Sequence, residues 1–162
     1  MRQPPIRRPS PNFDRRQLPV TMVVLHYTGM AEAEAAIERL CDPAAKVSAH
    51  YMIAEGGEVV AMVDEADRAW HAGVSWWRGI ADVNSASVGI ELQNPGHELG
   101  YRPFAEPQMA ALMALLPGIV ARHAITPANV VGHSDVAPTR KIDPGVLFDW
   151  ERLARAGLAL PR

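Results

Sequence analysis

The chain is organised around Val130-Val131-Gly132-His133-Ser134-Asp135, which continues through Pro138-Thr139-Arg140-Lys141-Ile142-Asp143-Pro144-Gly145. A short apolar run ends here in a histidine, and prolines and a glycine constrain the loop that follows. Histidine nitrogen and carboxylate oxygen are ligands that suit a divalent zinc ion. The ammonium of Lys141, two positions before Asp143, is a suitable partner for an oxyanion. This stretch therefore predicts a buried strand that leads into a candidate metal site.

A second buried strand is predicted at Thr21-Met-Val-Val-Leu-His26-Tyr27, an apolar, β-branched run with a histidine near its end. Ligands in open α/β sheets gather at the carboxyl ends of strands, so His26 and His133 are expected to meet over one edge of the sheet. With Asp143 they make three protein ligands and leave a fourth position for water, which is the pattern of a catalytic zinc site. The alternative for each histidine alone is a structural residue with satisfied hydrogen bonds.

A third strand is predicted at Ser87-Val-Gly-Ile-Glu91-Leu-Gln93, where a glutamate interrupts apolar neighbours. A carboxylate in such a strand must be paired, protonated or functional. The structural alternative for Glu91 is an ion pair with an arginine. Its functional role would be that of a general base toward water activated by the metal.

The loop Trp70-His71-Ala72-Gly73-Val74-Ser75-Trp76-Trp77 is rich in large aromatic side chains. These side chains could stack on a sugar or a peptide, or they could simply cover the core beneath a long loop. His97, in a polar loop, and His123, near a helix end, are predicted to be peripheral.

The remaining pattern alternates strands with helices, apart from one hairpin. We expect an α/β fold in a single domain, with a central mixed sheet flanked by helices. Proline opens the helix that begins at Glu106-Pro107 and recurs at Pro117, where a kink or a break is expected. The other predicted elements are helices over 31–40 and 147–156, strands over 48–54 and 58–63 joined by the turn 55–57, and a strand over 129–132.

Length and composition set the broad class. A chain of 162 residues with 48% hydrophobic residues suits one catalytic domain, predicted here at 20–162, behind a proline-rich arm over 1–19 that packs on it without regular structure. A net charge of −2 without a strong basic block argues against nucleic-acid binding. No membrane span or secretory signal is recognisable, so we expect a cytoplasmic monomer, or a periplasmic protein if a signal was removed before Met1.

With these residues in view, the chain resembles the zinc-dependent N-acetylmuramoyl-L-alanine amidases, the family of phage lysozyme-like amidases and peptidoglycan recognition proteins. The resemblance covers nearly the whole chain. The motifs that carry it are Val24-Leu-His26-Tyr-Thr28, Val47-Ser-Ala-His-Tyr51, Ala69-Trp-His-Ala-Gly-Val-Ser75, Asn84 with Ser87-Val-Gly-Ile-Glu-Leu92, Gly132-His-Ser-Asp-Val-Ala-Pro138 and Arg140-Lys-Ile-Asp-Pro-Gly145.

The resemblance implies a role for each motif. Zinc would be bound by His26, His133 and Asp143. Glu91 would be the catalytic carboxylate, and Lys141 would stabilise the tetrahedral oxyanion. The residues implied on the substrate side of the groove are Trp70, His71 and Asn84, with His50 facing the substrate or supporting the ligands.

The implied reaction is hydrolysis of the amide between N-acetylmuramic acid, or its anhydro form, and L-alanine in peptidoglycan or muropeptides. Lack of a recognisable signal favours recycling of anhydro-muropeptides over cleavage of murein outside the cytoplasm. Two alternatives remain: a non-catalytic peptidoglycan-binding protein, and a zinc peptidase that acts within the stem peptide.

Overall fold

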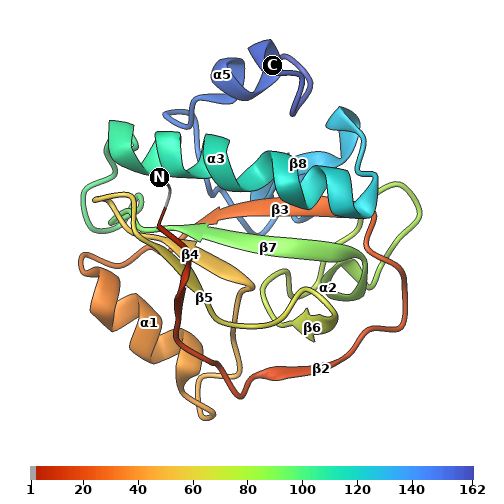
Figure 1. Ribbon diagram of the computed structural model, residues 1–162, viewed down its shortest axis with the longest axis horizontal. Helices are drawn as coiled ribbons and strands as arrows, with labels where there is room; N and C mark the ends of the chain where they lie inside the picture. The colour runs from red at the N-terminus through yellow and green to blue at the C-terminus, as the bar shows by residue number, and fades with distance from the viewer. Residues whose placement is uncertain (1–2) are drawn as a thin grey trace.

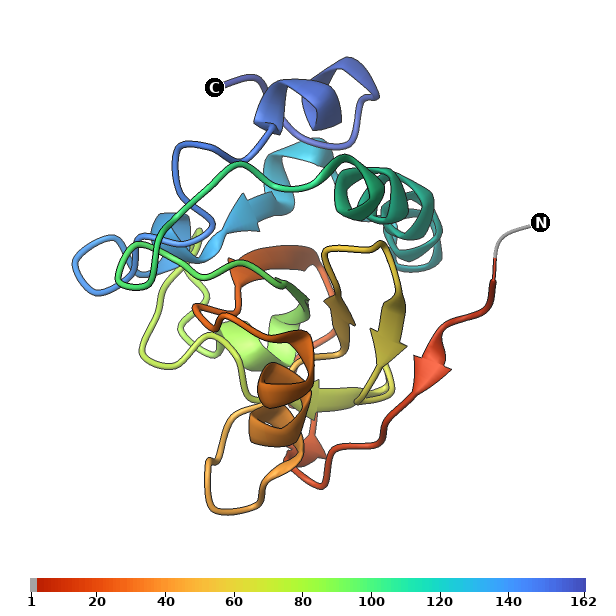
Figure 2. The same cartoon turned by 90° about the vertical axis from the view of Figure 1, so that its left-hand side faces the viewer.

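The computed structural model describes residues 3–162, which form a six-stranded mixed sheet covered by helices on both faces (Figures 1 and 2). The strand order is β1-β5-β4-β7-β3-β8. The expected α/β class with a mixed central sheet is therefore confirmed. The strands of this sheet are β1 (Ile6–Arg7), β3 (Met22–Tyr27), β4 (Tyr51–Ile53), β5 (Val59–Ala61), β7 (Ser87–Leu92) and β8 (Val130–Gly132).

Two further short strands, β2 (Phe13–Arg15) and β6 (Asp67–Ala69), pair antiparallel beside the main sheet. The helices are α1 (Ala33–Cys41), α2 (Val83–Ala86), α3 (Glu106–His123), a 3-10 turn η1 (Pro127–Asn129), α4 (His133–Val136) and α5 (Trp150–Arg155). None of the helices within residues 3–162 has the length and apolar character that crossing a membrane requires.

The centre of the sheet is parallel, since β4 pairs with β7, β7 with β3, and β3 with β8 in the same direction. The carboxyl ends of these strands therefore lie along one edge. The register places His26 of β3 directly beside Glu91 of β7. Gly132, the last residue of β8, pairs with Leu25, so His133 follows at the same edge. The register alone thus gathers three of the predicted site residues.

Side chains alternate between two layers along each central strand. Val23 and Leu25 of β3 join a core with the buried side of α3 and with α5, whereas Met22 and Val24 pack toward α2 and α4 on the opposite face. The helix α1 covers a separate cluster on β4 and β5, on that same opposite face (Figure 1). His26 and Glu91 continue the alternation of this second face, where the helices leave room for a cavity.

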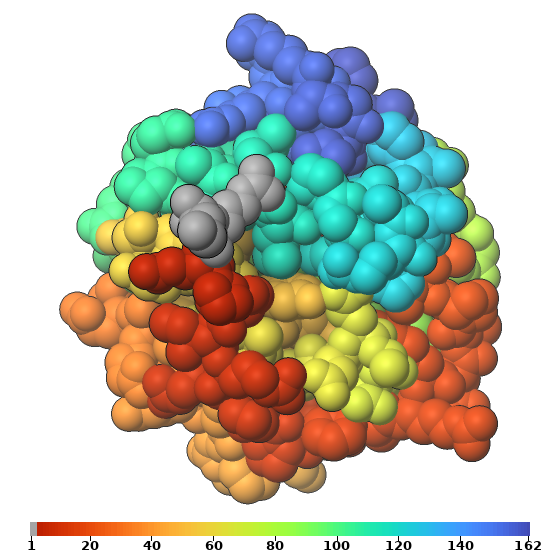
Figure 3. Space-filling view, in the orientation of Figure 1, coloured from red at the N-terminus to blue at the C-terminus, as the bar shows by residue number. Residues whose placement is uncertain are grey.

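The N-terminal segment differs from its expected lack of regular structure. β1 pairs in parallel with β5, and β2 pairs with β6, because the segment runs along two edges that supply free backbone partners. Figure 3 shows this segment lying across the molecule beside the β4–β5 hairpin and α3. The division of the chain into an arm and a catalytic domain stays a prediction.

Two helix predictions also need correction. The helix α3 runs without a break from Glu106 to His123 and passes through Pro117. The closing helix is shorter than predicted, because Asp149 caps it: its side chain accepts a hydrogen bond from the backbone N–H of Arg152, so α5 starts at Trp150.

Candidate metal centre and active-site cleft

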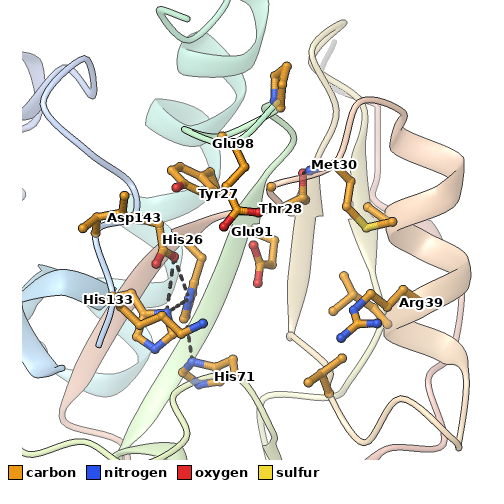
Figure 4. A pocket seen from close by; sticks show the side chains of 18 of the residues that line it. His26, Tyr27, Thr28, Met30, Arg39, His71, Glu91, Glu98, His133 and Asp143 are labelled. Carbon is orange, nitrogen blue, oxygen red and sulfur yellow. Dashed lines mark hydrogen bonds and ion pairs between the residues drawn. The ribbon is translucent and has the colours of Figure 1, made fainter. Parts of the chain in front are cut away.

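The three predicted ligands come together at the carboxyl edge of the sheet (Figure 4). Nδ1 of His26 lies 2.9 Å from Nδ1 of His133, and Oδ2 of Asp143 lies 3.3 Å from each of these nitrogens. All three side chains are buried, with exposed fractions of 1%, 5% and 6%. Their candidate ligand atoms all lie within 4.8 Å of one another.

The backbone around His133 and Asp143 explains why the pair converges. His133 is the first residue of α4, directly after β8, and the N–H of Ser134 donates to the carbonyl of Asp143 at 2.9 Å. The carboxylate of Asp135 accepts from the N–H of Gly132 at 2.7 Å and so fastens the turn between strand and helix. The loop that carries Asp143 is thereby held against the end of the strand.

The geometry of this trio fits a cation. Nε2 of His133 lies 3.0 Å from the carbonyl oxygen of Ala72, which can only accept, so Nε2 carries the proton and Nδ1 keeps its lone pair. Burial lowers the pKa of His26 to about 4, which leaves that ring neutral near pH 7. Oδ2 of Asp143 lies 3.3 Å from Nδ1 of both rings, so its carboxylate faces the same point. A carboxylate and the lone pair of His133 therefore face one point, and a divalent metal ion satisfies both.

Glu91 stands next to His26 in the sheet register. Its Oε2 is buried and makes no hydrogen bond with any group in residues 3–162. Burial raises the pKa of Glu91 well above its usual value, the Asp143 carboxylate raises it further, and the Lys141 ammonium opposes the shift. The structural alternative, an ion pair with an arginine, does not form within residues 3–162. Within the described chain, this carboxylate is left free for a water molecule or a substrate.

A cavity of about 500 Å³ opens over these residues. That size lies within the usual range for small-molecule sites. Besides the metal trio, Glu91 and Lys141, its wall includes residues from β3, from α1, from the loop before β4 and from the loops after β3, β6, β7 and α4. Among these lining residues are Tyr27, Arg39, Trp70, His71, His97 and Arg140.

The four residues predicted on the substrate side fall into two groups. Trp70 and His71 line the cavity, and Nε1 of Trp70 is buried without a hydrogen-bond partner in residues 3–162. His50 and Asn84 are not part of the cavity wall. His50 is fully buried, and its Nε2 contacts the guanidinium of Arg16 at 3.0 Å, while Asn84 Oδ1 accepts from the backbone N–H groups of His71 and Ala72. The geometry of His50 and Asn84 is that of supporting residues.

Sequence reasoning missed the residues that fasten the loops around the cavity. His97, predicted to be peripheral, lines the cavity, stacks on Tyr101 at 4.0 Å between ring centroids, and bonds the Tyr27 hydroxyl at 2.9 Å. Tyr101 in turn donates to the carbonyl of Pro144 at 2.7 Å. The segment 94–104 is thereby tied to the loop that carries Asp143. No local pattern in the sequence signals the contacts of Tyr27 with His97 and of Tyr101 with Pro144, since each joins segments more than 40 residues apart.

Arg140 was also missed, although it directly precedes Lys141. Its Nη2 donates to the carbonyls of Ala72 at 2.6 Å and Val74 at 2.8 Å. The aromatic loop after β6 is thus held against the loop that carries the third candidate ligand.

Comparison with known proteins gives concordant results. The profile of the N-acetylmuramoyl-L-alanine amidase family matches residues 16–146. The chain is 39% identical over 151 residues to the N-acetylmuramoyl-L-alanine amidase AmiD of Escherichia coli, covering 86% of this chain and 54% of AmiD. It is 35% identical over 163 residues to the 1,6-anhydro-N-acetylmuramyl-L-alanine amidase AmpD of Haemophilus influenzae, covering 88% of this chain and 86% of AmpD.

A solved structure of Escherichia coli AmiD, in complex with the substrate anhydro-N-acetylmuramic acid-L-Ala-D-gamma-Glu-L-Lys, matches with a TM-score of 0.80 and 38% identity. The match covers 86% of this chain and 58% of that chain. This chain therefore spans a little over half the length of AmiD, and most of the length of AmpD.

Proposed function

This chain belongs to the N-acetylmuramoyl-L-alanine amidase family, and from that premise we propose that it is a zinc-dependent amidase. Its substrate would be the amide bond between N-acetylmuramic acid, or 1,6-anhydro-N-acetylmuramic acid, and L-alanine. The structure of AmiD holds an anhydro-muramyl peptide of this kind, which supports soluble muropeptide fragments as the substrate class here.

One observation carries the proposal: the trio His26, His133 and Asp143 converges within 4.8 Å beside the unpartnered carboxylate of Glu91. Two imidazoles and one carboxylate, with an open cavity in front of them, form the donor set of a catalytic zinc site. When bound there, zinc would polarise the scissile carbonyl and acidify a water molecule.

Glu91 is suited to move the proton that the hydrolysis requires. The carboxylate would take a proton from the attacking water and deliver it to the amide nitrogen of L-alanine as the C–N bond breaks. Its raised pKa favours this double role, because a carboxylate whose pKa lies closer to the working pH can both accept and return a proton.

Lys141 would stabilise the negative charge that develops on the carbonyl oxygen. Its side chain lines the cavity and makes no hydrogen bond or ion pair with any other group in the described part of the chain. A cation without a partner inside a cavity is available to an oxyanion. Trp70 and His71 would form the wall against which the substrate rests, while His50 and Asn84 would contribute from behind that wall.

The proposed function is tested by mass spectrometry of the products from an anhydro-muropeptide. We expect zinc-loaded protein to release an intact peptide that begins with L-alanine, and metal-free protein to release none. Glu91→Gln, which keeps the size of the side chain, is expected to bind zinc and to lose at least about 10²-fold in rate. Wild-type turnover by this variant would contradict the assignment of the proton carrier.

The same products separate the alternatives. Cleavage within the peptide would indicate a zinc peptidase, and binding of the muropeptide without cleavage would indicate a peptidoglycan-binding protein. The free carboxylate of Glu91 beside the metal trio favours catalysis over binding alone. Intact murein serves as a second substrate: activity on fragments but not on murein would support a role in muropeptide recycling. A cytoplasmic location and a monomeric state stay predictions.

A further inference from the structure

We propose that the segment His71-Ala72, held by Asn84, orients both histidine ligands by supplying one hydrogen-bond acceptor to each. His71 accepts from His26, and the carbonyl of Ala72 accepts from His133. His71 and Asn84 are thus positioning residues, a role that His71 has in addition to its place in the cavity wall. This inference rests on the proposed function, since it takes His26 and His133 to be metal ligands.

A buried chain of hydrogen bonds runs from the carbonyl of Val83 through Ser87 and His71 to His26. The Val83 carbonyl fixes which group donates in each of these bonds. Oγ of Ser87 lies 2.6 Å from the carbonyl oxygen of Val83, which can only accept, so the single hydroxyl proton of Ser87 points there. Oγ of Ser87 also lies 3.1 Å from Nε2 of His71. Because the hydroxyl proton is already used, His71 must donate from Nε2 in this contact.

The chain then continues to the first ligand. His71 is buried and makes no ion pair with a carboxylate in residues 3–162, so the ring is neutral and carries a single proton. Its Nδ1 therefore accepts, and its neighbour at 2.9 Å, Nε2 of His26, must donate. The remaining nitrogen of His26, Nδ1, keeps its lone pair and faces His133 and Asp143.

Close packing keeps the His71 ring in this place. A Cβ on Gly89 would stand 2.5 Å from Cγ and Cδ2 of His71, so the ring lies directly on the backbone of β7. The carbonyl oxygen of the Asn84 side chain accepts from the N–H of His71 at 3.0 Å and of Ala72 at 2.8 Å. Asn84 thereby fixes the two consecutive residues that face the two histidine ligands.

The two outer acceptors should also affect metal affinity. A histidine ligand binds best when its outer nitrogen donates to a fixed acceptor, and loss of that acceptor typically weakens metal binding by about 10–100-fold. Here both outer acceptors belong to adjacent residues of one loop, so disturbing that loop should affect both ligands together.

Three variants and two measurements test the inference. His71→Leu removes the acceptor, whereas His71→Asn, of similar size, can present an amide oxygen near the position of Nδ1. Asn84→Ala releases the backbone of the segment. The first measurement is the zinc dissociation constant from competition with a chromophoric chelator. The second is the tautomer of His26 and His133 in zinc-free protein, from two-bond ¹H–¹⁵N NMR correlations.

In the wild type we expect both rings to be protonated at Nε2 before zinc is added. His71→Leu should raise the zinc dissociation constant by about 10–100-fold. In this variant His26 should populate both neutral tautomers, while His133 stays protonated at Nε2. His71→Asn should recover most of the zinc affinity. Asn84→Ala should disturb both rings. Thermal unfolding of the zinc-free variants serves as the control for folding.

Two outcomes would overturn the inference: a wild-type His26 protonated at Nδ1, or equal zinc affinity in the wild type and His71→Leu. If His71→Leu does not fold, the tautomers in the wild type and in His71→Asn still decide it. Wild-type protein that binds zinc in this manner but cleaves no muropeptide would contradict the proposed function and leave the positioning role intact.

Discussion

At the scale of single residues, Glu91 and Lys141 both line the cavity, and neither side chain makes a hydrogen bond or an ion pair within residues 3–162. Their separate positions suit separate tasks, since the carboxylate stands on β7 beside the metal trio and the ammonium stands on the loop that carries Asp143. Neither group stabilises the fold through a contact, so changing either one should affect the rate much more than stability.

Lys141→Met should lower kcat by about 10²–10³-fold, because the stem remains while the charge that faces the oxyanion is lost. Lys46→Met is the matched control, since Lys46 is the second lysine of the chain and is exposed outside the cavity wall. Steady-state kinetics on an anhydro-muropeptide measures both variants. A Lys141→Met enzyme with the kcat of the control would show that the ammonium does not act in the transition state.

Gly89→Ala tests the packing of His71 on β7. The new methyl group would overlap the imidazole ring, so we expect a loss of about 1–3 kcal/mol in the free energy of unfolding together with weaker zinc binding. Gly118→Ala is the control: its Cβ meets only the end of the Arg122 side chain, and a gain of about 0.5–1 kcal/mol is expected within a helix. Denaturant titrations of both variants give the comparison, and unchanged stability in Gly89→Ala would contradict it.

At the scale of elements, α3 shows how packing outweighs local propensity. Four side chains on its inner face, Met109, Leu112, Leu116 and Ile119, are buried against the sheet. That contact continues on both sides of Pro117, which is itself exposed. The helix therefore stays unbroken, although proline removes one hydrogen bond and crowds the preceding turn.

Pro117→Ala should stabilise the protein by about 1–3 kcal/mol, since it restores the hydrogen bond and costs little buried surface. Pro107→Ala in the first turn of the same helix should change stability very little, because an N–H there has no helical partner. Guanidinium unfolding midpoints of the two variants measure the difference. Equal midpoints would mean that Pro117 does not lower the free energy of unfolding.

At the scale of the whole molecule, a cluster remote from the cavity joins the loop after β5 to β4 and to the end of α3. The carboxylate of Glu65 accepts from the Tyr51 hydroxyl at 2.5 Å and from Arg122 at 2.7 Å, and it contacts His123 at 2.6 Å. Burial alone would raise the pKa of Glu65, but the hydrogen bonds from Arg122, Tyr51 and His123 outweigh it and lower the pKa to about 2.

This lowered pKa makes the cluster a source of acid sensitivity. Between about pH 4.5 and pH 2 the unfolded chain binds the Glu65 proton and the folded chain does not, so the stabilisation is complete above this window and is lost as the pH falls through it. Glu65→Gln should lower the free energy of unfolding by about 1–2 kcal/mol at pH 7. The loss is no larger because Arg122 is exposed and solvent screens its charge. The difference from the wild type should shrink toward pH 3 in urea titrations. A constant difference across this range would contradict the assignment.

Residue types and their order were sufficient to predict the family resemblance, the class of the fold and the three central strands. Long apolar, β-branched runs such as 21–27 bury both faces of a strand whatever the details of their neighbours. Because parallel strands end at one edge, placing His26 and His133 at strand ends was enough to predict their meeting. The candidate ligands and Glu91 were therefore accessible from residue type and position alone.

Which residues support the site, by contrast, depends on contacts that form only when the chain folds. The edge strands β1 and β2 form because β5 and β6 offer unpaired backbone, which the proline-rich N-terminal sequence does not reveal. The contacts of His97, His71 and Asn84 likewise depend on partners brought close by folding. A hydrogen bond requires a donor and an acceptor about 3 Å apart, and residue type alone sets neither that distance nor the direction of the proton.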